Sequence, residues 1–111
     1  MPFIDTAGLE PKLPLPGWEG RFFHSENVTL AYYRIAAGAE IHEHEHPNEE
    51  IWNVIEGELE MTLDGERRVL GPGSAAVIPS NMPHSARALR DSRAIVVDHP
   101  RRSSVGGVDI D

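Results

Sequence analysis

The chain has 111 residues, a formal charge of −8 from 10 basic and 18 acidic residues, and no cysteine. This length fits one domain, and an acidic surface repels phosphate backbones and anionic lipid, so we expect neither a nucleic-acid partner nor a membrane partner. The lack of cysteine excludes disulfides, thiol catalysis and thiolate metal sites, which leaves histidine, carboxylate and carbonyl groups as metal ligands. The sequence shows no long apolar run and no signal-peptide pattern, so we expect a soluble, cytoplasmic protein.

Proline dominates the start of the chain. Residues 1–20 contain Pro2, Pro11, Pro14 and Pro16. Proline has no amide donor and a fixed φ, which disfavours both a helix and a central strand. We therefore expect residues 1–20 to form an extended arm that lies across a sheet edge or a partner subunit.

From Trp18 onward the sequence is typical of short strands separated by turns. Residues rich in β-branched and aromatic side chains, or alternating between apolar and polar, occupy 28–35, 51–55, 59–63, 66–70, 75–78 and 94–98. Asp64-Gly65, between two of these segments, is a strong hairpin signal. Such spacing indicates an all-β antiparallel sandwich or barrel, which we place at residues 21–100. Residues 101–111 are small and polar, and we expect a flexible tail.

Histidines repeat at every second position in one segment. His42, His44 and His46 alternate along the chain, and on a strand the side chains at i and i+2 share a face about 6.6 Å apart. Glu50 begins the next apolar segment, and a hairpin would return its carboxylate to these imidazoles. His84 follows a proline-bounded turn and would fold back from another strand. Three imidazoles and one carboxylate suit iron, manganese, nickel, cobalt or zinc as a divalent ion.

Two other interpretations of this segment are weaker. A solvated, acidic and histidine-rich edge does not account for the regular repeat on one face. Residues 42–46 also satisfy the zinc-protease pattern H-E-x-x-H, but that chemistry needs a helix, and Gly38 and Pro47 bound the segment closely. Whether His42 binds the metal, supports a ligand or faces solvent stays open. His24 and His99 have no such neighbours and are interpreted as ordinary polar residues.

The spacing of these residues resembles the two conserved motifs of the cupins. Residues Gly38, His44, His46, Glu50 and Gly57 fit the first motif, G-x5-H-x-H-x3/4-E-x6-G. The second motif, G-x5-P-x-G-x2-H-x3-N, is matched by Gly73, Pro79 and His84, with Asn81 and Ala88 as departures. Asparagine tolerates the left-handed turn conformation, and the motif's final asparagine is not usually a ligand. The motifs span residues 38–88.

This resemblance implies a single double-stranded β-helix, or jelly-roll, barrel that often forms homodimers. It implies one divalent transition metal (Fe, Mn, Ni, Co or Zn) in the barrel mouth, with ligands His44, His46, Glu50 and His84. Gly57 and Gly73 would turn the chain between strands, and Pro79 and Pro83 would stiffen the loop that delivers His84.

The resemblance does not name a reaction, because cupins include enzymes of several classes and binding modules. In cupins that open or linearise unsaturated uronates, an acid and an arginine near the last strand assist the metal. Asp98 and Arg101, or Arg102, occupy a comparable place here. This implies an enzyme acting on a small oxygen-rich metabolite such as a sugar acid or keto acid. Asp98 would be a general base, and the arginine would bind a substrate carboxylate.

Two alternatives stay open: an Fe(II)-dependent dioxygenase, and a noncatalytic module that binds or senses a small molecule. Trp52 and Met61 lie on expected strands that could line the pocket, although buried aromatic and methionine side chains more often belong to the core. The parity of Trp52 relative to Glu50 predicts that its side chain faces inward.

Overall fold

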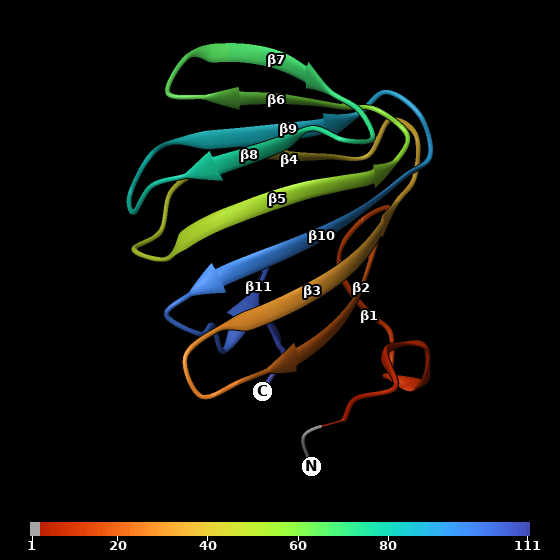
Figure 1. Ribbon diagram of the computed structural model, residues 1–111. Helices are drawn as coiled ribbons and strands as arrows, with labels where there is room; N and C mark the ends of the chain where they lie inside the picture. The colour runs from red at the N-terminus through yellow and green to blue at the C-terminus, as the bar shows by residue number, and fades with distance from the viewer. Residues whose placement is uncertain (1–2) are drawn as a thin grey trace.

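The computed structural model describes residues 3–111. These residues form two main antiparallel sheets that face each other, a small two-stranded sheet and one 3₁₀ turn, η1 (Thr6–Gly8) (Figure 1). The six-stranded sheet has the order β1 (Lys12–Leu15), β2 (Trp18–His24), β3 (Thr29–Ile35), β10 (Ser92–His99), β5 (Glu49–Glu56) and β8 (Ala75–Ile78). The four-stranded sheet has the order β4 (Glu40–His44), β9 (His84–Ala88), β6 (Leu59–Leu63) and β7 (Glu66–Leu70). Within residues 3–111, no helix is long and apolar enough to cross a membrane. The expected all-β jelly-roll fold is confirmed.

The core lies between the two main sheets and is formed largely by every second side chain along their strands. Along β3 and β10, every second residue is buried, as a strand with one face on a core requires. Aromatic rings from the six-stranded sheet fill one part of this core. Trp18 packs edge-on against Tyr33 with ring centroids 5.5 Å apart, and Tyr33 stacks on Trp52 at 6.1 Å. The expected inward orientation of Trp52 is confirmed, since its side chain is buried.

The predicted hairpin at Asp64-Gly65 is confirmed. Both residues have positive φ, 47° and 84°, as a two-residue hairpin turn with the twist of the flanking strands requires. Leu63 and Glu66 lie opposite each other in the register of β6 and β7.

The N-terminal segment is extended and lies at a sheet edge, and part of it is itself a strand. Lys12–Leu15 forms β1, which pairs with β2 at the edge of the six-stranded sheet. Pro14 lies inside this strand, a position that proline tolerates because an edge strand has unpaired amides. The expected boundary between residues 20 and 21 falls inside β2, and Pro2 of the expected arm lies outside the described residues.

The C-terminal segment, expected from its composition to be a flexible tail, packs against the barrel in the structure. Residues 104–109 form a hairpin of β11 (Ser104–Val105) and β12 (Val108–Asp109). Val105 and Ile110 are only 7% and 3% exposed, because they cover the barrel core.

Neither His24 nor His99 belongs to a ligand cluster among the described residues. His24 donates from Nε2 to the Ile110 carbonyl at 2.8 Å and contacts Thr29 Oγ1 through Nδ1, so this histidine has a structural role. His99 is exposed, as expected of an ordinary polar residue.

Gly57→Ala is expected to destabilise the fold by about 3 kcal/mol or more, because two costs combine at this turn. Gly57 has φ +86°, and an added Cβ would lie 2.5 Å from the Asp91 carbonyl oxygen and closer still to the Ser92 hydroxyl. Gly73→Ala is the matched control: Gly73 has φ +89° but open space around it, so only the backbone cost of about 1–2 kcal/mol applies. Urea unfolding followed by circular dichroism measures both. Equal losses in the two variants would refute the steric argument.

Candidate metal centre

A bulge in β4 turns His44 into the barrel. Ile41 pairs with Ala86 of β9, but the next pair is His44 with His84, so β4 has one extra residue in this stretch. A bulge of this kind changes which face the following side chains occupy. As a result, both Ile41 and His44 line the interior cavity. His42 has an exposed side chain and lies outside the ligand cluster.

Glu50 reaches the histidines from the opposite sheet. The expected hairpin between the two segments was wrong, because β4 belongs to the four-stranded sheet and β5 to the six-stranded sheet. The chain crosses between the sheets at residues 45–48, and the side chains meet across the barrel. His46 also lies in this crossing, beyond the end of β4. The expectation that His44 and His46 share one face of a single strand therefore does not apply.

The three imidazoles are held in the same way, each by a hydrogen bond from its Nδ1 atom to a main-chain carbonyl. The Nδ1 atoms of His44, His46 and His84 donate to the main-chain carbonyls of His42, Asn48 and Met82, at 2.9, 3.1 and 2.8 Å. A carbonyl can only accept, so each Nδ1 carries the proton and each Nε2 has a free lone pair. One potential ligand atom from each histidine lies within 4.8 Å of the others. Burial lowers the pKa of His44, which favours the neutral form that metals bind.

Glu50 adds a carboxylate to this cluster. Glu50 Oε2 lies 3.2 Å from His46 Nε2, and Oε1 lies 3.7 Å from His84 Nε2. These nitrogens are buried and have no hydrogen-bond partner among the described residues. Buried lone pairs without a hydrogen-bond donor cost free energy, and a bound cation would offset that cost. The four side chains therefore fit a divalent transition metal.

Asp98 and Arg102 extend the cluster. Asp98 of β10 lies directly opposite Glu50 of β5, and both residues are 3% exposed. Arg102 Nη1 lies 3.5 Å from Glu50 Oε2 and 3.9 Å from Asp98 Oδ1. Burial and the neighbouring Glu50 raise the pKa of Asp98. Burial opposes ionisation of Glu50, but its contacts with His46 and Asp98 and the hydrogen bond from the Trp52 indole lower its pKa, so the carboxylate form is favoured at Glu50.

Arg101 does not join this cluster. Its guanidinium donates to the Ser25 carbonyl at 3.5 Å and lies 3.5 Å from Asp111 Oδ1 on the exposed surface. Of the two arginines considered from the sequence, only Arg102 lies beside Glu50 and Asp98. Arg101 and Arg102 therefore face different surroundings although they are adjacent in the chain, and the structure does not bring Arg101 to the cluster.

Sequence reasoning missed two aromatic side chains beside the site. Trp18 and Tyr33 line the same small cavity as His44, Glu50 and Arg102. Burial, together with Glu50 and Asp98, raises the pKa of Tyr33, so its hydroxyl keeps its proton. The sequence did contain a signal for Tyr33. It alternates along the strand with Ala31 and Ile35, which are also buried, so the three side chains share one face of β3. Met61 is buried in β6 and does not line this cavity.

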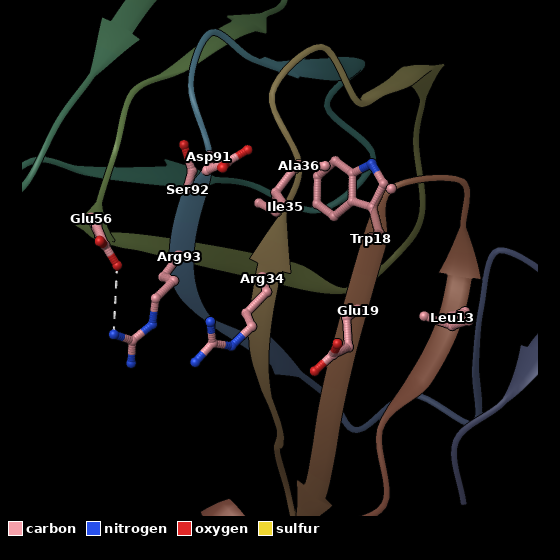
Figure 2. A pocket seen from close by; sticks show the side chains of 11 residues that line it. Leu13, Trp18, Glu19, Arg34, Ile35, Ala36, Glu56, Asp91, Ser92 and Arg93 are labelled. Carbon is pink, nitrogen blue, oxygen red and sulfur yellow. Dashed lines mark ion pairs between the residues drawn. The ribbon is translucent and has the colours of Figure 1, made fainter.

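A larger hollow elsewhere on the molecule offers no metal-binding imidazole. Figure 2 shows this hollow of about 570 Å³, with Arg34 and Arg93 side by side and Glu56 paired with Arg93 at 3.6 Å. Trp18 also lines it, but its lining residues include no histidine. The histidine cluster is therefore the candidate site.

The family model for the cupin domain matches residues 31–100, which contain all the candidate ligands. The chain belongs to the cupin family. Among curated relatives, dimethylsulfoniopropionate lyase DddQ of Ruegeria pomeroyi is 37% identical over 70 residues, covering 62% of this chain and 35% of that protein. Polyketide synthase CurC of Streptomyces cyaneus is 40% identical over 77 residues, covering 65% and 50%. This cupin chain thus spans half or less of the length of these relatives.

Solved structures match over nearly the whole chain. KdgF from Halomonas sp. has a TM-score of 0.83 and 32% identity, with 90% of this chain and 93% of that chain covered. An RmlC-like cupin from Shewanella frigidimarina has a TM-score of 0.87 over 92% and 93% of the two chains, and its 22% identity shows the fold alone.

Proposed function

We propose that this cupin is a metal-dependent enzyme that acts on a small sugar acid or keto acid. The observation that carries the proposal is the meeting of Asp98 and Arg102 with the three histidines and Glu50. A plain metal-storage site needs ligands only. Here a buried acid and an arginine lie beside the ligands, which gives the site a group for moving a proton and a group for binding an anion.

The residues have distinct roles in this proposal. His44, His46, His84 and Glu50 hold one divalent ion, which supplies Lewis-acid polarisation of a substrate oxygen. Arg102 binds the substrate carboxylate. Asp98 moves a proton at its carboxyl group. The protonated Tyr33 hydroxyl lines the same cavity and donates a hydrogen bond to a substrate oxygen.

The preferred substrate class is an unsaturated uronate, by resemblance to the cupins that open these rings. In such a ring, removal of the anomeric hydroxyl proton forms the C=O bond and breaks the ring C–O bond. The electron pair passes to the released enolate, which takes a proton on carbon to give a linear keto acid. The reaction is an isomerisation and needs no oxidant. Asp98, whose raised pKa favours its protonated form, is the candidate group for giving the proton to the enolate carbon, and the proton released by the anomeric hydroxyl restores it.

Proton NMR of an unsaturated uronate tests this proposal. The protein is loaded separately with each of the five candidate metals, and the expected result is loss of the ring vinyl signal at a rate above that without protein. No conversion with any loaded metal would overturn the proposal for this substrate class. Uptake of O₂ by the iron form would instead favour the dioxygenase, and binding without turnover would favour a sensing module.

Dimer formation stays a prediction. Ile51 and Ile55 of β5 and Val77 of β8 expose apolar side chains on the outer face of the six-stranded sheet. Contact with a second copy would remove these side chains from water, and sedimentation equilibrium measures the resulting mass.

A further inference from the structure

The cavity beside the candidate ligands is too small for a metabolite. Its volume is about 20 Å³, which is room for about one water molecule. Pockets that bind small organic molecules measure roughly 300–1,000 Å³. A ligand of sugar-acid size therefore needs part of the cavity wall to move.

Both ends of the chain supply this wall. Pro14 and Leu15 of β1 line the cavity on one side, and Arg102 and Val105 line it from the C-terminal segment. The remaining lining residues come from the inner faces of the two main sheets: Trp18, Tyr33, Ile41, His44, Glu50, Trp52 and Val96.

The two end segments are packed together at Gly106. An added Cβ at this glycine would lie 2.5 Å from the Pro14 carbonyl oxygen and 3.3 Å from Leu15 Cδ2. Lys12 Nζ also donates to the Asp109 carbonyl at 3.2 Å. The hairpin and β1 thus close the cavity as one unit, and the absence of a side chain at Gly106 permits the contact.

This unit is attached to the barrel less firmly than the central strands are. β1 is an edge strand whose register shifts between Lys12 and Leu15. The hairpin forms its own two-stranded sheet, separate from the two main sheets. Short edge elements with few backbone hydrogen bonds open at lower free-energy cost than central strands.

We propose that Leu15 and Val105 form a gate over the cavity, held closed by the packing of Gly106 on β1. The gate sets the size of the molecule that reaches Arg102 and the histidine cluster. This selection by size rests on the proposed function, but the gate itself does not.

Tryptophan fluorescence reports the gate without metal or substrate. Trp18 and Trp52 are the chain's only tryptophans, and both line the cavity. Trp18 is 2% and Trp52 5% exposed, so quenching by acrylamide, a small neutral molecule, requires the structure to open, and the matched variants below assign that opening to the cavity rather than to the hollow that Trp18 also borders. The metal-free full chain is used, so failure of the metal proposal does not affect the result.

Gly106→Ala is expected to increase the acrylamide quenching constant severalfold. Gly107→Ala is its matched control, because Gly107 also has positive φ, +79° against +56°, but its added Cβ meets nothing within 4 Å. Equal quenching constants in the two variants would count against the gate.

Leu15→Ala gives a second, independent test. It can be used even if the Gly106→Ala variant does not fold. Its control is Leu13→Ala, on the same strand but 73% exposed. Leu59→Ala, in the four-stranded sheet and fully buried, controls for general loss of stability. The gate predicts faster quenching in Leu15→Ala than in both controls. Quenching in Leu15→Ala no faster than in Leu13→Ala would overturn the proposal.

Discussion

The His44→Ala/His46→Ala double variant is expected to purify without transition metal, whereas the parent chain is expected to bind about one equivalent. The substitutions remove two of the three Nε2 lone pairs that converge within 4.8 Å. Loss of a group that merely supports a metal ligand weakens binding by about 10–100-fold, so loss of two ligands is expected to exceed about 100-fold. Elemental mass spectrometry of tag-free protein measures the metal content.

His42→Ala is the matched control for this result. His42 belongs to the same histidine repeat, but its side chain is exposed, and only its main-chain carbonyl supports His44. We expect its metal content to equal that of the parent. Circular dichroism establishes that each variant is folded. Full metal occupancy in the folded double variant, after reloading with each candidate ion, would exclude the proposed ligand set.

The strands could be predicted because their signals are local. Alternation along 59–63 and the Asp64-Gly65 turn depend only on neighbours in the sequence, and the structure forms both as expected. The histidine and glutamate spacing was also informative, since it identified four side chains that the fold brings together.

The crossing between sheets could not be predicted from the same signals. Whether Glu50 returns in a hairpin or enters the opposite sheet depends on which strands pair with β5, and those partners are β8 and β10, both distant in the sequence. The bulge before His44 is likewise set by the register with β9. Both features depend on pairing between distant segments.

The C-terminal residues show the same limit. A polar composition predicted a flexible tail, but two isolated apolar residues, Val105 and Ile110, were enough to bind the segment to the core. This packing also decides between the two arginines. The amide of Arg102 donates to Thr29 Oγ1 at 2.9 Å, and its side chain lies beside Glu50, while Arg101 is left on the surface.

Arg102→Lys is expected to reduce kcat/KM on a uronate by about 100-fold or more while metal content stays unchanged. Lysine keeps the charge but loses the planar pair of donors that binds a carboxylate at two oxygens. Misplacement of the bound substrate by about 1 Å lowers the rate as well as the affinity, so both KM and kcat are expected to change. Steady-state kinetics on metal-loaded protein measures both.

Arg101→Lys separates this role from the general effect of losing an arginine in the same segment. Its guanidinium faces Ser25 and Asp111 on the surface, so kcat and KM are expected to match those of the parent. Arg102→Lys with reduced metal content would show instead that Arg102 mainly supports Glu50 as a ligand. Equal kinetics in the two variants would leave the site without its anion-binding group, and the proposal of an acidic substrate would then be wrong.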